Sequence, residues 1–184
     1  DPAGIAIASQ LSSDIRGSGQ AIRNALDGKF LISTAEGAHS EIENILQRMR
    51  EAAVQAANDA NDTQDRTNLN EEMKALSTEI DRIASATTWA GQNLMSANSS
   101  VFSFQVGTSI SAKNSISLAI GSMSASALLV TPSAVSVTGA EASRTALSAI
   151  DAAMARVNTQ RANLGAMANR LSYTVNNLTN VSSN

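Results

Sequence analysis

Apolar residues recur every three or four positions towards both ends of the chain. One stripe passes through Ile45, Met49, Ala52 and Ala56. A second stripe passes through Leu147, Ile150, Met154, Val157, Arg161, Leu164, Ala168, Leu171, Val175 and Leu178. This spacing places one narrow seam along each helix, and another helix lying nearly parallel must cover it. The pattern predicts that the two ends of the chain pair as long helices.

The periodicity predicts three helices in all. They are a first long helix over residues 1–58, a second over 63–88 and a return helix over 138–181. Gly17, Gly19 and Gly28 lie inside the first stretch, and each costs up to about 1 kcal/mol relative to alanine in a helix interior. We therefore expect a bend or break near these glycines unless tertiary contacts hold the helix.

The pattern changes to strict alternation within residues 100–137. The alternating apolar positions are Phe102, Phe104 and Val106, followed by Ile116, Leu118 and Ile120. A period of two predicts a β-hairpin. The rest, from Gly121 onward, has no clear period and no charge, and we expect an irregular crossing with a short strand near Leu128–Val130. The predicted fold is a single domain over 1–184, a mainly α, elongated antiparallel rod of three long helices with a small β-hairpin region.

Composition narrows the range of functions. Hydrophobic residues make up 43% of the 184 residues but aromatic residues only 3%, which favours close-packed helices over a wide ligand pocket. A formal charge of -3, without a Lys/Arg cluster, gives no general attraction for nucleic acid. No apolar run approaches the roughly 20 residues that span a membrane. The absence of cysteine excludes disulfides and thiolate metal sites.

Two arrangements superficially suggest chemistry. His39, the one histidine, is near Glu36 and Ser40, but no glycine-rich elbow surrounds them, and the helical spacing predicts an ordinary surface pair of Glu36 and His39. The polar run over residues 58–65 offers oxygen ligands but lacks the glycine and terminal glutamate of a calcium loop. We expect turn and capping chemistry there, with a weak surface cation left open. The chain is predicted to be no enzyme and to hold no cofactor or metal.

Several segments resemble, in the same order, the core of bacterial flagellins. They are LQRMREAAVQAANDAND from Leu46, EIDRIASATTWAGQNLM from Glu79, FSFQVG from Phe102 and IDAAMARVNTQRANLGAMANRLSYTVNNLTN from Ile150. The opening segment also resembles this family, so the match covers the whole chain. The resemblance implies a core domain without the conserved terminal helical segments and large outer domains. One departure is local: the family usually has Phe-Asn-Gly at Trp89, Ala90 and Gly91, which puts the asparagine's hydrogen bonding in doubt.

The resemblance implies a structural subunit of the flagellar filament. Flagellins are secreted and self-assemble into an extracellular helical tube for motility. Other flagellin subunits are the implied partners, with an export chaperone and a cap protein for the full-length chain, and an animal Toll-like flagellin receptor as a further candidate. Two alternatives stay open: a hook-filament junction protein, and a cell-surface adhesin that binds polysaccharide through Trp89 or Tyr173.

The resemblance also implies contact residues on the exposed side of the first helix. By that match Gln47, Arg48 and Glu72 contact a neighbouring subunit or the receptor, and Leu46 and Glu51 flank them. Asp65 and Arg82 are implied candidates for biasing the switch between filament forms. Ordinary solvated charge is the alternative for both of these residues.

Arg161 is a charged residue at a seam position where an apolar side chain is expected. It must reach solvent along its alkyl stem or meet a carboxylate such as Glu43, Glu72 or Glu79. Its role is either control of helix register or contact with the next subunit. Removal of Arg161 shifts the melting temperature in the first case and only filament growth in the second.

Overall fold

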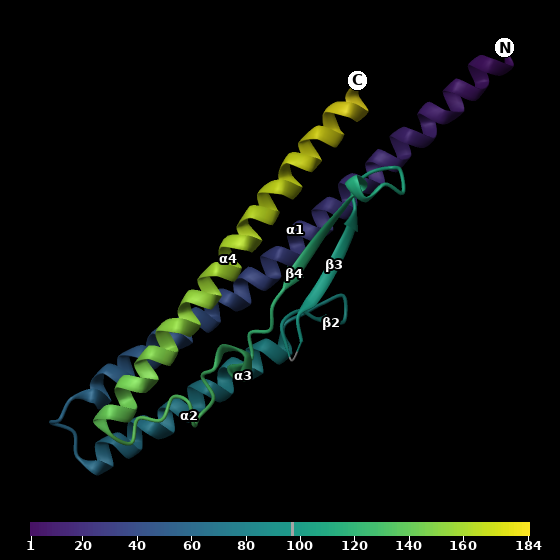
Figure 1. The fold of residues 1–184 in the computed structure, drawn as a ribbon. Coiled ribbons are helices and arrows are strands. Elements are labelled where there is room, and N and C mark those ends of the chain that lie inside the picture. The colour runs from purple at the N-terminus through teal and green to yellow at the C-terminus, as the bar shows by residue number, and fades with distance from the viewer. Residues whose placement is uncertain (97) are drawn as a thin grey trace. The chain divides into compact units, whose positions relative to one another are not determined.

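Helices dominate the computed structural model, which describes residues 1–96 and 98–184 (Figure 1). The helices are α1 (Pro2–Ala57), α2 (Thr63–Ala86), the single turn α3 (Ala125–Leu128) and α4 (Ala140–Ser183). The strands form two antiparallel pairs, β1 (Thr88–Trp89) with β2 (Gln92–Asn93) and β3 (Ser100–Gln105) with β4 (Ser115–Ile120). A 3-10 turn, η1 (Ala112–Asn114), precedes β4. The prediction of a mainly helical fold with a small β region is confirmed.

The chain forms two compact units, each assembled from segments distant in sequence. Unit 1 contains Asp1–Ser33, Val101–Ala119 and Asn163–Asn184, and unit 2 contains Thr34–Ser100 and Ile120–Ala162. Each unit includes part of α1 and part of α4. Each unit therefore combines a part of the first long helix with a part of the last.

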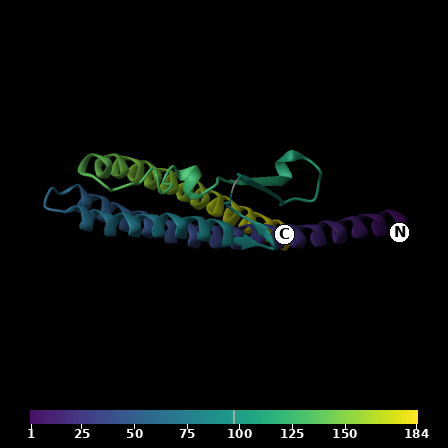
Figure 2. The same cartoon turned by 90° about the horizontal axis from the view of Figure 1, so that it is seen from below.

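The glycines of α1 do not interrupt the helix. α1 is continuous over 56 residues (Figures 1 and 2), so the expected break is absent. In unit 1 a Cβ atom at Gly28 would lie 3.0 Å from Leu171 Cδ1 and 3.4 Å from the Phe104 ring. A Cβ at Gly17 would lie 2.7 Å from Thr108 Cγ2. These two glycines therefore allow α4 and the hairpin loop to approach α1, and these tertiary contacts offset the helical cost of glycine.

The core of unit 2 is a seam between helices. Its large buried side chains are Ile42, Leu46 and Met49 of α1, Met73 and Ile80 of α2, and Ile150 and Val157 of α4. Leu46 is completely buried, whereas Ile45 is only half-buried. Met49, Ala52 and Ala56 of the predicted stripe are completely buried, so the stripe departs from its prediction only at Ile45, where Leu46 takes the core position.

The crossing segment after β4 differs from its prediction. α3 takes the place of the short strand expected near Leu128, so that prediction is wrong. Ser124 caps α3, its Oγ accepting a hydrogen bond from the Ala127 amide at 3.1 Å. A local capping interaction thus decides the conformation of a stretch without apolar periodicity.

Polar side chains along one face of α2 hold the crossing segment in place. They are Asn70, which accepts from the Val137 amide at 3.0 Å, Ser77, which donates to the Val130 carbonyl at 2.8 Å, and Asp81, which accepts from the Ala125 amide at 2.7 Å. The segment therefore runs antiparallel to α2. Its buried backbone groups bond to side chains instead of to a neighbouring strand.

The turn between β1 and β2 contains a backbone conformation that alanine adopts rarely. Ala90 has a φ of 50° and Gly91 a φ of 79°. The left-handed region costs a residue with a Cβ roughly 1–2 kcal/mol, and asparagine tolerates it better than alanine does. Alanine in place of the flagellin asparagine therefore places a less tolerant residue in a left-handed conformation.

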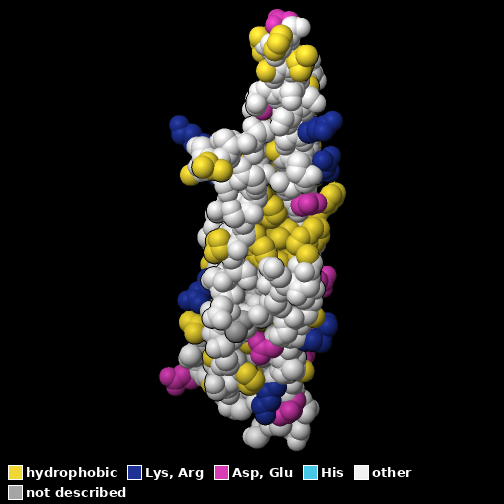
Figure 3. All heavy atoms as spheres, turned by 90° about the vertical axis from the view of Figure 1, so that its right-hand side faces the viewer, with side chains coloured by type: hydrophobic (Ala, Val, Ile, Leu, Met, Phe, Trp, Pro, Cys, Tyr) yellow, Lys and Arg dark blue, Asp and Glu magenta, His cyan; other side chains and the backbone are white. Residues whose placement is uncertain are grey.

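The surface carries both signs of charge. On the face drawn in Figure 3, Lys and Arg side chains are interspersed with Asp and Glu. Among the described residues, no helix is both long and apolar enough to cross a membrane.

Candidate assembly surfaces

Three of the predicted contact residues form one exposed ion-pair cluster in unit 2. Arg48 of α1 donates to Glu72 of α2 twice, from Nε to Oε1 at 2.6 Å and from Nη2 to Oε2 at 2.9 Å. Its Nη1 also lies 3.2 Å from Glu51 Oε2. The Arg48, Glu51 and Glu72 side chains are 45%, 70% and 35% exposed. The hydrogen bonds that Arg48 donates to Glu72, and then to Glu51, raise the pKa of Arg48, so this arginine is permanently charged.

A shallow hollow of about 550 Å³ lies beside this cluster on α1. Its lining residues are Gln47, Arg50, Glu51, Val54 and Gln55. Val54 is 48% exposed, although it is apolar. The sequence interpretation did not include Arg50 and Val54 among the contact residues. Their spacing of three and seven positions from Gln47 indicates that they share its helix face and could have identified them.

Arginines connect the exposed strip of α1 to both neighbouring helices. Arg48 bonds to α2 through Glu72, and Arg50 Nε lies 2.8 Å from Asp151 Oδ1 of α4. We call the exposed side chains of Gln47, Arg48, Arg50, Glu51, Val54 and Glu72 the outer face. The outer face thus carries ion pairs that link α1 to α2 and α4 and remain in contact with water.

Leu46 does not belong to the outer face. Its side chain is completely buried in unit 2, so its placement as a flanking contact residue was wrong. The physical reason is the helix phase: a residue four positions after the buried Ile42 and three before the buried Met49 faces the core.

The two residues predicted to bias filament form lie apart from this cluster. Asp65 and Arg82 are seven and ten positions from Glu72, which is about 10 and 15 Å along α2. Asp65 completes a capping box, accepting from the Asp62 amide at 3.1 Å while its own amide donates to Asp62 Oδ1 at 2.8 Å. Arg82 is exposed and pairs with Glu79 at 2.5 Å. Both residues therefore have local partners within the subunit.

Arg161 pairs with two carboxylates of α1 inside unit 2. Its Nη1 bonds to Glu43, and its Nε lies 3.4 Å from Glu36 Oε2. The Arg161, Glu36 and Glu43 side chains are 35%, 32% and 15% exposed. Of the carboxylates considered from the sequence, Glu43 is the partner. Glu72 and Glu79 pair instead with Arg48 and Arg82.

His39 is not part of a surface pair. Its side chain is completely buried, which contradicts the prediction of an exposed Glu36–His39 pair. The sequence contained the signal, because Ala35, His39 and Ile42 follow the same steps of four and three as the buried stripe. The prediction gave weight to charged neighbours in sequence and too little to helix phase.

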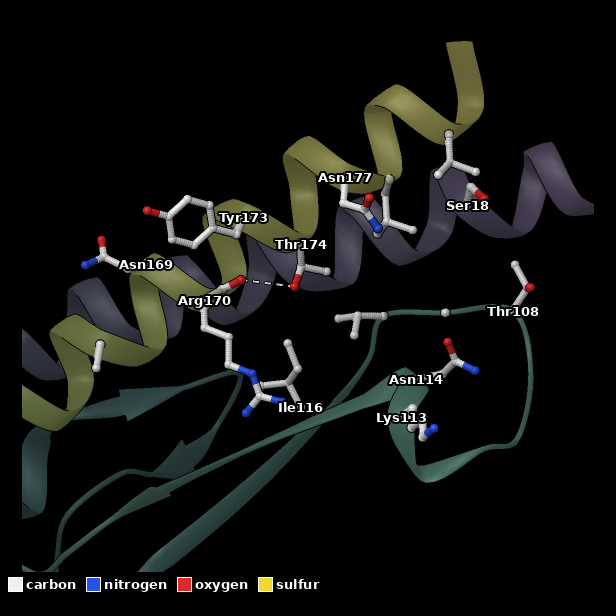
Figure 4. Close-up of a pocket in the computed structure, with 15 residues that line it drawn as sticks. Ser18, Thr108, Lys113, Asn114, Ile116, Asn169, Arg170, Tyr173, Thr174 and Asn177 are labelled. Atoms are coloured by element: carbon white, nitrogen blue, oxygen red, sulfur yellow. Dashed lines mark hydrogen bonds between the residues drawn. The ribbon is translucent and has the colours of Figure 1, made fainter. Parts of the chain in front are cut away.

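Unit 1 contains an open groove of about 780 Å³ between α1, the β3–β4 loop and the last part of α4 (Figure 4). Val106 and Ile116 supply buried apolar surface. Lys113 comes from the loop, and Arg170 reaches from α4 toward Ile116. No Asp or Glu is among the described residues that line the groove. Its charge is therefore positive on a chain that is acidic overall.

Tyr173 also lines this groove and is 75% exposed. In Figure 4 its ring projects away from the β3–β4 loop. Trp89, the other aromatic residue considered for sugar binding, is half-buried in unit 2. The two aromatic residues thus belong to different units.

Two family descriptions match the two ends of the chain. Residues 1–100 match the bacterial flagellin N-terminal helical region, and residues 147–184 match the bacterial flagellin C-terminal helical region. Together they cover more than half of the chain.

Curated relatives agree with this match. A flagellin of Halalkalibacterium halodurans is 41% identical over 184 residues, covering 100% of this chain and 67% of the relative. Flagellin E of Vibrio cholerae is 41% identical over 128 residues, covering 70% of this chain and 33% of the relative. The chain thus spans about two thirds of the first relative and about one third of the second.

Solved structures show the same fold. The crystal structure of Bacillus cereus flagellin has a TM-score of 0.70 at 27% identity and covers 85% of this chain and 88% of that chain. A Vibrio parahaemolyticus protein described as flagellar hook-associated has a TM-score of 0.80 at 19% identity, covering 100% of this chain and 97% of that chain. The second likeness concerns the fold alone.

These similarities confirm the family predicted from the sequence motifs. Flagellins are structural proteins of the flagellar filament and not enzymes. The chain belongs to the bacterial flagellin family.

Proposed function

We propose that this chain is the core of a flagellar filament subunit and that its outer face contacts a neighbouring subunit. The observation that carries the first part is 41% identity to a flagellin along the entire chain. The assembled product is an extracellular helical tube that serves motility. The second part rests on the outer face.

The outer face suits a specific contact between subunits. Its charges are of both signs and already paired, so it does not attract opposite charge indiscriminately. Val54 and its hollow offer an apolar anchor point for a side chain of the partner. A face with a small apolar centre and a polar rim is typical of protein–protein interfaces.

The groove of unit 1 suits a different segment of a neighbouring subunit. Lys113 and Arg170 favour an acidic occupant. The turn between α1 and α2 carries Asp59 and Asp62, Asp65 follows in the first turn of α2, and all three are exposed. We infer that this acidic segment of one subunit approaches the groove of another, which places Asp65 in the contact and gives it a route to the predicted influence on filament form. Arg82 is the weaker candidate for such influence, since it lies at the other end of α2.

Electron microscopy of the full-length protein tests the outer face. Arg48→Glu reverses the central charge and is expected to prevent filament formation while the helical circular dichroism signal stays normal. Arg144→Glu is the matched control, because Arg144 is also an exposed helical arginine but lies on α4 outside the outer face. Normal filaments from Arg48→Glu would contradict the proposed contact.

The groove has its own test. Lys113→Glu with Arg170→Glu is expected to shorten or abolish filaments, and a compensating change of Asp59 to lysine, which leaves the Asp62–Asp65 capping box intact, is expected to restore them at least in part. Restoration by the compensating change identifies the acidic segment as the occupant. Filaments unaffected by the first pair would exclude the groove as a contact.

Further partners follow from the family and remain proposals for this chain. An export chaperone and a cap protein act on the full-length subunit during secretion and growth. The animal Toll-like flagellin receptor binds the outer face in this proposal, with Gln47, Arg48 and Glu72 as contacts. Arg48→Glu is then expected to weaken receptor activation by the soluble monomer, whereas Arg144→Glu leaves it unchanged.

An adhesin function is the second candidate. The observation that favours it is the exposed Tyr173 beside a groove lined by asparagine and threonine side chains, which suit sugar hydroxyls. Polysaccharide binding by the chain, lost in Tyr173→Ala, would support this function. No binding at millimolar sugar would exclude it.

A further inference from the structure

His39 has an unusual environment for a polar side chain. It is the single histidine of the chain and is completely buried within unit 2. Its Nδ1 lies 2.6 Å from the Ala35 carbonyl oxygen. Because a carbonyl only accepts hydrogen bonds, Nδ1 carries the proton of the neutral ring. Nε2 is then an acceptor, and it has no hydrogen-bond partner among the described residues.

The charges acting on the imidazole come from both helices of the seam. Glu36 belongs to α1, and Arg161 belongs to α4 and bridges Glu36 and Glu43. Burial is the main influence and lowers the pKa of His39; the Ala35 carbonyl and Glu36 raise it, and Arg161 lowers it further. The result is a pKa below the ordinary value for histidine.

Protonation of this ring conflicts with its surroundings in two ways. It places an N–H group on Nε2, which has no hydrogen-bond acceptor among the described residues. It also places a second cation near Arg161, whose two carboxylates are already engaged. A buried imidazolium without an acceptor is strongly unfavourable, so its protonation requires water to enter the seam.

We propose that His39, together with the Arg161–Glu36–Glu43 cluster, is an acid-sensitive latch that holds α1 against α4 in unit 2 at neutral pH and loosens in mild acid. The latch acts within one subunit and does not depend on the filament function proposed above. This role explains why a residue with an unpartnered Nε2 atom occupies the seam. An apolar side chain would fill the same space but would not respond to pH.

The sign of the pH effect follows from linkage. The unfolded chain has an ordinary histidine with a pKa of about 6.5, and the folded chain has a lower pKa. Between these two values the unfolded state binds more protons. The stabilising contribution of neutral His39 is therefore complete above about pH 6.5 and is lost as the pH falls towards the folded value.

Proton NMR measures the folded value directly, because the chain has a single imidazole to observe. We expect the His39 ring to titrate clearly below pH 6.5 in the folded wild-type chain. In Arg161→Gln, which removes the neighbouring cation and frees the two carboxylates, the titration is expected to move to higher pH. A wild-type titration at or above pH 6.5 would overturn the latch.

Denaturant unfolding at pH 7.5 and at pH 5.0 measures the consequence. For each pH unit by which the folded pKa lies below 6.5, counted down to the final pH of 5.0, the wild-type folded-to-unfolded ratio is expected to fall about tenfold more on acidification than in His39→Leu. His39→Gln is the matched polar control, since it keeps a hydrogen-bonding side chain at the site but does not titrate. An equal fall in wild type and both variants would contradict the proposal.

Discussion

Unit 2 contains two clusters with the same chemistry, each made of one arginine and two glutamates. The cluster of Arg48 with Glu51 and Glu72 is open to solvent, and that of Arg161 with Glu36 and Glu43 lies in the seam between α1 and α4. Glu51 is 70% exposed and Glu43 only 15%. This difference in burial gives the clusters different effects on stability. Solvent and salt screen the outer ion pairs, so they contribute little to folding, whereas loss of one inner partner leaves a desolvated charge behind.

Consecutive residues of α1 show how sharp the boundary between these environments is. Leu46 is completely buried and Gln47 is exposed. A helix turns by about 100° per residue, so one step along the chain moves a side chain from the seam to the outer face. Substitutions on the two sides should therefore separate folding from assembly.

The largest expected effect is at the seam itself. Leu46→Ala should lower the free energy of unfolding by about 2–5 kcal/mol, because it removes three buried carbons and leaves a cavity. Gln47→Ala is the adjacent control and should change it by less than about 0.5 kcal/mol. Urea unfolding measures both values. Similar values for the two variants would place Leu46 outside the core and break the comparison.

Arg161→Gln should have the next largest effect. It leaves Glu36 and Glu43 without their cation in a half-buried site, so we expect a loss of about 1–3 kcal/mol, between the ranges for exposed and buried pairs. Glu43→Gln, which keeps a polar side chain, should recover part of this loss in the double variant. A melting temperature unchanged by Arg161→Gln would instead favour a contact with the next subunit.

The outer cluster should contribute least to folding. A double-mutant cycle with Arg48→Gln and Glu72→Gln should give a coupling energy of about 0.2–1 kcal/mol at low salt. The coupling should largely disappear at 1 M salt, where screening acts over about 3 Å. A coupling that survives high salt would show that the outer pair behaves like the inner one.

Periodicity in the sequence predicted the helices and most of their buried positions, with an ambiguity at Ile45 and Leu46. The steps of three and four are clear around Ile42, yet Ile45 and Leu46 are both apolar, and Ala52 and Ala53 are both buried. Two neighbouring apolar positions fit two phases equally well, so periodicity alone did not contradict the resemblance that placed Leu46 among the contacts. Packing against α2 and α4 decides between them.

Other features depend on partners that the sequence does not identify. The apolar residues of the crossing segment show no regular spacing that would predict its conformation. Its backbone groups bond instead to the side chains of Ser77 and Asp81 of α2. Glu36 was not foreseen as a partner of Arg161, since the pairing depends on the register between α1 and α4. The flagellin resemblance, by contrast, named Arg48 and Glu72 together as contact residues, although not as an ion pair.

The most direct test is the fraction of folded full-length subunits that enters filaments, measured by sedimentation of the Arg48→Gln and Arg161→Gln variants. Outer-face contact predicts that Arg48→Gln folds normally but remains in the supernatant. The remaining folded Arg161→Gln subunits should sediment as wild type does. The reverse pattern, with Arg48→Gln sedimenting and folded Arg161→Gln left in solution, would contradict the division of roles between the two clusters.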